Sequence, residues 1–331
     1  MPMQVKSTVK RYRQVVLDGA TNLSALVLAP LFARVARTGV GSEHCLQHKY
    51  LPLPVHYYSP VPDVQDLERR NVWNHRSALA GIDFQAAAQE ALLLKLGDEF
   101  GQECQWPATP TEDPYQFYTQ VVNFSYGCAA VTHCMVRHFQ PRHVIEVGSG
   151  NSSLVLAAAL RANGAEGQNT EQEYVVVDPY PRRNIEKGLP GLTGLNQQPV
   201  ETLSPEFFDR LGANDILFID SSHTVRIAGD VNFLILEVLP RLAPGVLVHF
   251  HDIDLPREYP KTYITNPRFR VLWTETYLLQ AFLSCNSQFE LLLAMSYLMH
   301  DRPTVFQRAF PHYDPVQHRL YSSSFWIRRR A

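Results

Sequence analysis

The sequence lacks the features of a disulfide-rich, nucleic-acid-binding or membrane protein. Its five cysteines are scattered, odd in number and without a C-x-x-C pair, which argues against a disulfide framework or a zinc ribbon and favours a reducing compartment. A formal net charge of −2 gives no general basic field for nucleic acid. We find no apolar run of transmembrane length. We therefore expect a cytoplasmic protein that binds neither nucleic acid nor membranes.

The N-terminus needs a separate test, because basic residues precede the apolar segment 23–29. This order resembles the start of a secretory signal. Asp18 interrupts the approach to the apolar segment, however, and Pro30 follows it directly. The pattern of residues 14–37 instead predicts an ordinary amphipathic helix.

Two regions differ in their patterning. Residues 1–115 show no alternation of strands and helices, and we expect them to form a helical and irregular cap that covers the substrate. Within it, His56, Tyr57 and Tyr58 lie in the proline-rich segment LPLPVHYYSPVPD. Prolines stiffen a loop, so these aromatic side chains are candidates for a wall of the substrate pocket. The alternative is that they only pack the loop onto the domain.

Residues 116–331 alternate between strands and helices, starting with a helix over 118–138. Such alternation predicts an α/β, Rossmann-like fold with a seven-stranded, mostly parallel sheet, whose last strand is a candidate for an antiparallel edge. The expected strands are 143–147, 174–178, one near Pro199, 215–220, 246–250, 290–294 and 324–327. Nothing in the pattern excludes a homo-oligomer.

A glycine-rich turn follows the first of these strands and precedes a run of helix-forming residues. Glycines let the backbone approach a ligand, and the free N–H groups of the following helix point toward it. Ser152 and Ser153 are candidate N-caps of this helix. The turn therefore predicts a nucleotide site.

The kind of nucleotide follows from what this turn lacks. A dinucleotide fingerprint needs a third glycine where Ser153 stands, and a phosphate-binding P-loop needs a lysine after Gly150. The turn has the pattern Glu146-x-Gly148-x-Gly150 instead. This pattern resembles motif I of the class I S-adenosylmethionine-dependent methyltransferases, and a carboxylate beside the glycines is consistent with the cationic, phosphate-free cofactor that the resemblance implies.

Other polar residues end the later strands. In an open α/β sheet, ligands bind outside the carboxyl ends of the strands. Asp178 ends the second strand, where a carboxylate can accept both hydroxyls of a ribose, or else cap the next turn. Asp220 ends the fourth strand, with His223 shortly after it, and His251-Asp252 ends the fifth. Their oxygen and imidazole donors suit Mg, Mn or another divalent ion. His249 lies within its strand, and we expect it to be structural.

The series EVGSG, VVVDP, DILFIDSSH, LAPGVLVHFHDI and SFWIRR resembles the class I S-adenosylmethionine-dependent methyltransferases over residues 116–331. It is most similar to bacterial small-molecule methyltransferases that share the D-S-S-H, H-D-I and YSP-x-PD segments. The resemblance implies S-adenosylmethionine as cofactor and a small-molecule acceptor. The residues that it implies for the cofactor are Glu146, Gly148, Ser149, Gly150, Ser152, Asp178, Pro179, Asp220 and Ser221.

Catechol and macrolide-sugar O-methyltransferases are similar in layout and hold Mg with acidic residues after the fourth and fifth strands. By position, the resemblance implies a metal site at Asp220, His251 and Asp252. His251 stands where those families have a carboxylate, so it is a candidate ligand or general base.

The residues and the resemblance together predict methyl transfer to a hydroxyl of a secondary metabolite or a sugar. Asp220, His223 and His251 are the candidate catalytic residues, because imidazole has a suitable pKa for taking the acceptor's proton. Methylation of a nitrogen and a non-catalytic cofactor-binding module are the alternatives. An NAD-dependent oxidoreductase is disfavoured by the missing third glycine.

Overall fold

The computed structural model describes residues 2–121, 123–167, 172–267, 269–318 and 321–331. The chain forms two compact units that divide between Asn71 and Val72. The division thus comes before the boundary that we placed at residue 115, and the segment 72–115 belongs to the larger unit.

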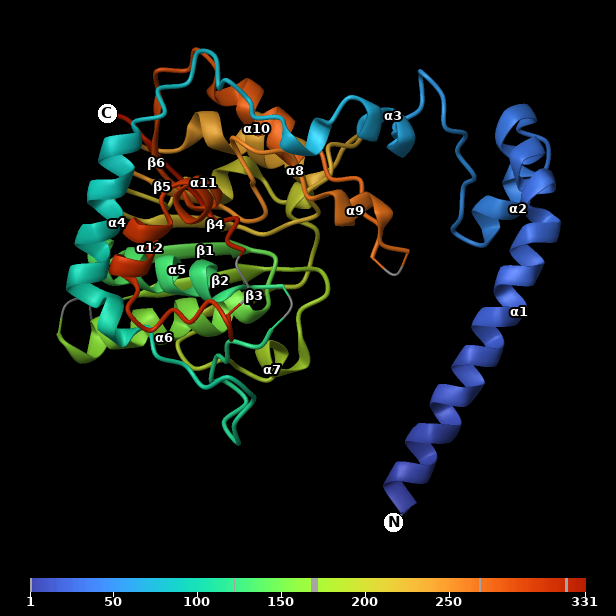
Figure 1. The fold of residues 1–331 in the computed structure, drawn as a ribbon. Coiled ribbons are helices and arrows are strands. Elements are labelled where there is room, and N and C mark those ends of the chain that lie inside the picture. Colours follow the sequence, from blue (N-terminus) through green and yellow to red (C-terminus); the bar gives the residue numbers. More distant parts are fainter. Residues whose placement is uncertain (1, 122, 168–171, 268, 319–320) are drawn as a thin grey trace. The chain divides into compact units, whose positions relative to one another are not determined.

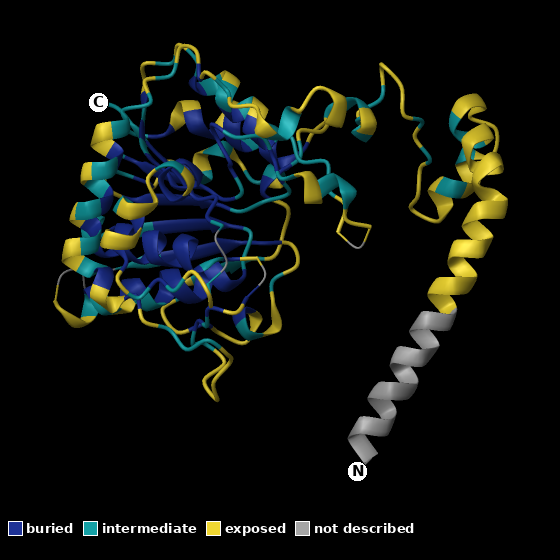
Figure 2. Ribbon diagram, viewed as in Figure 1, coloured by how far each residue is buried: buried dark blue, intermediate teal, exposed yellow. Residues whose placement is uncertain are grey.

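The first unit is helical. It contains α1 (Pro2–Thr38), α2 (Ser42–Gln47) and α3 (Val64–Arg69). Segment Leu17–Thr38 of α1 has a mean hydropathy of 1.3 and is long and apolar enough to cross a membrane. None of it is buried within the structure, as the exposed colouring in Figure 2 shows. Our expectation that no apolar run reaches this length is therefore wrong, since the few charged residues stand near the ends of this segment.

The second unit is built on a seven-stranded sheet with strand order β3-β2-β1-β4-β5-β7-β6. Strands β1 to β5 are parallel to one another, whereas β7 is antiparallel to both β5 and β6. This topology confirms the predicted α/β, Rossmann-like fold with a seven-stranded, mostly parallel sheet. The strands are β1 (His143–Val147), β2 (Glu173–Val177), β3 (Gly194–Asn196), β4 (Ile216–Ile219), β5 (Leu247–Phe250), β6 (Phe289–Ala294) and β7 (Phe325–Arg329).

Two strands differ from the sequence-based expectation. The third strand is Gly194–Asn196, not a segment near Pro199; it pairs with the end of β2. Pro199 has no N–H to donate to a ladder, and it is followed by a short 3-10 turn, Val200–Thr202. The last strand, β7, lies between β5 and β6 and not at an edge.

Helices cover both faces of the sheet (Figure 1). On one face α4, α5, α6 and α12 pack against one another, and α10 contacts the helical run after α8. Helix α5 begins only at Tyr126, later than predicted, because the Ser125 hydroxyl accepts the N–H of Cys128 and caps it there. The helices of this unit are α4 (Ala86–Phe100), α5 (Tyr126–Phe139), α6 (Asn151–Ala165), α7 (Arg183–Glu186), α8 (Asp230–Asn232), α9 (Lys261–Thr265), α10 (Glu275–Leu283), α11 (Met295–Asp301) and α12 (Pro303–Ala309). Short 3-10 or π segments are η1 (Val72–Asn74), η2 (Gly101–Glu103), η3 (Val200–Thr202), η4 (Pro205–Phe208), η5 (Phe233–Val238) and η6 (Leu239–Arg241).

A close approach between α4 and α12 ties the segment 72–115 to this unit. A Cβ at Gly97 would lie 2.4 Å from the carbonyl oxygen of Ala309. We predict that Gly97→Ala lowers the free energy of unfolding by on the order of 1–2 kcal/mol, because overpacking outweighs the gain of about 1 kcal/mol in helix propensity. Urea denaturation measures this change.

Gly212→Ala is the matched control, since the nearest atom to its added Cβ, an oxygen of Asp215, would be 3.7 Å away. Equal stability of the two variants would contradict the close packing of α4 on α12.

Candidate active site

The glycine turn after β1 passes directly beside the end of β4. Gly148 has φ +82°, and a Cβ there would lie 1.8 Å from the carbonyl oxygen of Asp220. Only glycine fits both the backbone angle and the space. The absence of this one side chain brings the turn and Asp220 together at the carboxyl edge of the sheet.

Helix α6 starts from this turn through a different cap than predicted. Gly150 is the N-cap, and its N–H donates to the Ser153 hydroxyl at 3.0 Å. Ser152 is not a cap, because its hydroxyl donates to Glu146 at 2.6 Å. Arg182 lies beside the turn and donates to the side-chain oxygen of Asn151 at 2.9 Å; we had not singled it out.

Glu146 lies inside the sheet. Its buried carboxylate accepts hydrogen bonds from the hydroxyls of Ser152 and Tyr174. Burial raises the pKa of Glu146 to about 7, although these hydrogen bonds oppose the shift. The carboxylate thus links β1, β2 and α6, and its direct contact with a cofactor stays a prediction.

Asp178 joins the end of β2 to the glycine turn. One of its carboxylate oxygens accepts the N–H of Ser149 at 2.8 Å and the Ser149 hydroxyl at 2.5 Å. The other accepts the N–H of Tyr180 at 2.7 Å, across Pro179. Asp178 therefore lies beside the glycine turn, and its carboxylate holds both this turn and the loop after β2.

Acidic and histidine side chains converge at the ends of β4 and β5. His223 Nε2 lies 3.2 Å from a carboxylate oxygen of Asp220 and 3.7 Å from one of Asp252, and its Nδ1 lies 2.8 Å from Glu275. His251 Nδ1 lies 3.3 Å from Asp252 and 3.5 Å from Asp220. Glu275, at the start of α10, was not among the predicted residues. Because it comes from a distant helix, no spacing in the sequence pointed to it.

The charges in this cluster shift each other's pKa values. Burial lowers the pKa of His223, but its hydrogen bonds to Asp220 and Glu275 raise it to about 10. Burial lowers the pKa of His251 as well. The charges of Asp252 and Asp220 outweigh this effect and raise the pKa of His251 well above its ordinary value. In return, the imidazoles hold the pKa of Asp220 well below its usual range, against the effect of burial.

One oxygen of Asp220, one nitrogen of His223 and one oxygen of Asp252 lie within 4.8 Å of one another. These are donor types that a divalent cation accepts. The metal site predicted from the sequence contained His251 in place of His223. His251 lies next to this group, with its Nδ1 3.5 Å from Asp220 and 3.3 Å from Asp252. His249 is buried within β5 and stacks on Phe218 with ring centroids 3.8 Å apart, which agrees with a structural role.

A cavity of about 360 Å³ opens beside His251 and Asp252. Aromatic rings dominate its wall, which also contains Cys128 and several neutral polar side chains. The aromatic residues are Phe124, Tyr263, Phe269, Trp273 and Tyr321. Most of them come from the segment after β5 and from the approach to β7. Our sequence analysis missed them, although the density of aromatic residues between 259 and 277 was a usable signal.

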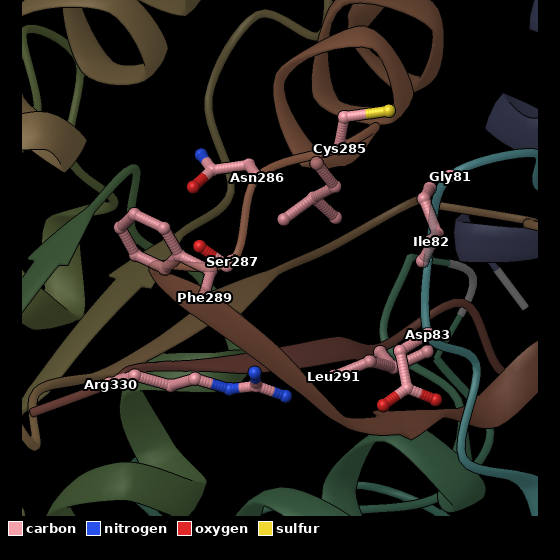
Figure 3. Close-up of a pocket in the computed structure, with 10 residues that line it drawn as sticks. Gly81, Ile82, Asp83, Cys285, Asn286, Ser287, Phe289, Leu291 and Arg330 are labelled. Carbon is pink, nitrogen blue, oxygen red and sulfur yellow. The ribbon is translucent and has the colours of Figure 1, made fainter.

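A smaller cavity of about 240 Å³ lies elsewhere, at the start of β6 (Figure 3). Arg330 and Asp83 stand on opposite sides of it in this view. The carboxyl ends of β4 and β5 lie at the other edge of the sheet, so this cavity has no part in the acid-histidine cluster.

Comparison with known proteins identifies the central part of the chain. Residues 145–253 match a family model described as "Methyltransferase domain". The chain carries a methyltransferase domain. The match contains the glycine turn, Asp178, Asp220, His223 and His251-Asp252, whereas Glu275 lies beyond it.

Similar proteins extend over different parts of the chain. An uncharacterized protein of Archaeoglobus fulgidus is 28% identical over 170 residues, which cover 49% of this chain and 75% of that protein. The SAH-bound structure of Podospora anserina methyltransferase PaMTH1 has 14% identity and a TM-score of 0.41, covering 75% of this chain and 97% of its own. A putative protein-L-isoaspartate O-methyltransferase from Plasmodium falciparum, in complex with S-adenosyl-L-homocysteine, has 14% identity and a TM-score of 0.27 over 57% of this chain and 81% of its own.

The predicted substrate residues His56, Tyr57 and Tyr58 lie in the first unit, outside the methyltransferase domain. The side chains of Tyr57 and Tyr58 are 93% and 87% exposed. Their rings contact each other edge to face, with centroids 5.0 Å apart. Their role in binding an acceptor stays a prediction.

The two glycines of the turn provide a test of its geometry. We predict that Gly148→Ala abolishes cofactor binding and lowers stability, because the added Cβ meets the backbone of β4. Gly150→Ala should retain the stability of the native protein, since the nearest atom to its added Cβ is a side-chain nitrogen of Arg182 at 3.7 Å. Thermal unfolding and calorimetric titration with S-adenosylmethionine measure both effects.

If Gly150→Ala keeps its stability but loses binding, the backbone at Gly150 approaches the cofactor closely. A Gly148→Ala protein with native stability and affinity would refute the close contact with Asp220.

Proposed function

We propose that the protein transfers a methyl group from S-adenosylmethionine to a hydroxyl of a small molecule. One observation carries this proposal. The acid-histidine cluster of Asp220, His223, His251 and Asp252 lies between the glycine turn and an aromatic cavity. A donor on the turn and an acceptor in the cavity would meet at this cluster, where an imidazole that a bound cation keeps neutral could take the acceptor's proton.

The turn and the strand ends fit the cofactor. Asp178, held beside Ser149, presents a carboxylate where the ribose hydroxyls of a nucleoside would lie. Pro179 follows Asp178 directly, and Ser221 continues the backbone next to Asp220, so both would lie beside the cofactor. In this proposal the N–H groups at the start of α6 face the cofactor's carboxylate.

The cavity fits an uncharged acceptor that contains a ring. Five aromatic side chains line it, and its lining contains no lysine or arginine among the described residues. Aromatic faces pack against the flat or apolar face of a ring, and the neutral polar side chains of the wall can bind hydroxyls. A secondary metabolite or a sugar has this chemistry.

The acid-histidine cluster also fits a divalent cation such as Mg or Mn. Asp220, His223 and Asp252 would hold it, with His251 beside them. When bound, such a cation lowers the pKa of an acceptor hydroxyl. Its charge would also offset the mutual repulsion of carboxylates that lie close together.

The chain's own residues would align the two reactants. Methyl transfer is an in-line displacement, so most of the catalysis comes from positioning. Trp273 and Phe124 flank the cluster and its cavity, since Trp273 contacts the ring of His223 and Phe124 that of His251. Glu275 and Asp220 fix both nitrogens of His223 and so orient its ring.

We predict that Asp178→Asn weakens binding of S-adenosylmethionine by about tenfold or more, because a charged hydrogen bond contributes roughly 1.5–3 kcal/mol. The amide can still accept the N–H of Ser149, so the turn should stay folded. Calorimetric titration measures the affinity.

Titration with NAD is the control, and we expect no binding because the turn lacks the third glycine. An unchanged affinity of Asp178→Asn for S-adenosylmethionine would remove the ribose role from Asp178. Preferential binding of NAD would refute the cofactor assignment.

We further predict that methyl transfer to hydroxyl acceptors requires Mn or Mg and stops in EDTA. Asp252→Asn should reduce transfer by on the order of a hundredfold and leave the affinity for S-adenosylmethionine unchanged, because it acts on the acceptor side. The assay follows labelled methyl groups from S-adenosylmethionine into pairs of small molecules that differ only in a hydroxyl or an amine.

Activity that survives exhaustive EDTA treatment, without a gain on adding Mg or Mn, would refute the metal and leave a histidine as the base. Transfer only to amines would support the N-methyltransferase alternative. Cofactor binding without transfer to any acceptor of the panel would support a non-catalytic module.

A further inference from the structure

We infer that helix α1 anchors the protein to a lipid bilayer. The inference is independent of the proposed function, because it rests on the first unit alone. Segment Leu17–Thr38 is long and apolar enough to enter a membrane, and none of it is buried within the structure. A buried core helix would also be long and apolar, but this segment covers no core.

The distribution of apolar side chains around α1 favours lipid over a protein partner. Residues 23–33 contain leucine, valine, phenylalanine and alanine at every angle of the helix, with Ser24 and Pro30 as the interruptions. Leu26 and Leu31 are 75% and 60% exposed. A helix that packs against one partner keeps a polar face on the opposite side. A helix that is apolar all round is covered completely only in a core or in lipid.

The length of the uncharged stretch is also suitable. No charged residue occurs between Asp18 and Arg34. These residues span about 22 Å at 1.5 Å per residue, and long basic side chains at the ends can reach the headgroups. The stretch therefore reaches deep into a hydrocarbon core of about 30 Å.

Basic residues flank this stretch on both sides. Lys6, Lys10, Arg11 and Arg13 precede it, and Arg34 and Arg37 follow it. Each basic residue near an anionic membrane surface contributes about 1 kcal/mol to binding. The charges thus complement a bilayer with anionic lipids, whereas they would repel the same ends of a second copy of α1 in a parallel pair.

The cysteines indicate on which side of the bilayer the methyltransferase domain lies. All five are free, and three of them are buried in the second unit. Free thiols are typical of a reducing compartment. We therefore place the methyltransferase domain on the cytoplasmic side.

Flotation with lipid vesicles tests the anchor in the full-length protein. We expect it to float with vesicles of phosphatidylcholine and phosphatidylglycerol, to bind them more strongly than vesicles of phosphatidylcholine alone, and to resist an alkaline carbonate wash. The double variant Leu26→Asp/Leu31→Asp should reduce the floating fraction on the order of tenfold or more, because charged side chains are costly in the hydrocarbon core.

The matched control is Leu236→Asp/Val316→Asp, which places two acidic residues at apolar positions of the second unit that are 52% and 92% exposed. It should float like the native protein. Both variants should bind S-adenosylmethionine with the native affinity if that cofactor assignment is right, and circular dichroism reports their folding in either case.

Three results would overturn the anchor. The first is flotation of Leu26→Asp/Leu31→Asp equal to that of its control. The second is a native protein that ignores vesicles and forms a dimer that Leu26→Asp/Leu31→Asp dissociates, which would make α1 an interface between copies. The third is mass spectrometry of protein from cell membranes that lacks residues 1–38, which would identify a cleaved signal.

Discussion

Three carboxylates, one buried and two partly buried, lie together at the carboxyl ends of β4 and β5, and the rest of the site depends on how their charge is balanced. Asp220, Asp252 and Glu275 surround the rings of His223 and His251 within hydrogen-bond or ion-pair distance. Buried charges of one sign are tolerated only with opposite charges close to them. The two imidazoles, or a cation in the proposed function, supply that balance. The cluster is consequently a set of charged side chains beside a cavity that is lined mainly by aromatic rings.

The geometry that places this cluster next to a nucleotide-type turn comes from one close backbone contact and one carboxylate. Gly148 lets the turn touch the backbone of Asp220, and Asp178 holds Ser149 from the other side. The turn is thus fixed between the ends of β2 and β4. A ligand on it faces the cluster without any rearrangement of the sheet.

The features that could be predicted from the sequence are those that local signals determine. The glycine turn, the strand before it and the helix after it follow one another without interruption, so their spacing was sufficient. The strand ends at Asp178, Asp220 and His251-Asp252 followed from the rule that ligands bind at the carboxyl edge of such a sheet. Nonlocal features were missed. Whether His223 or His251 joins the two aspartates depends on loop conformation, since His223 and Asp252 both have positive φ values. Glu275 and β7 reach their places through tertiary packing.

The same distinction explains the error at the N-terminus. We judged α1 by its flanking charges and by Asp18 and Pro30, which are local signals, and expected an amphipathic helix. What decides the role of a helix is which of its faces finds a partner, and that is a tertiary property. The described side chains of α1 are exposed all round the helix. The helix therefore has no buried apolar face opposite a polar one. The pattern of residues therefore predicts that a helix forms. Whether that helix packs in a core, against a partner protein or in a membrane depends on which of its apolar residues become buried, and by what.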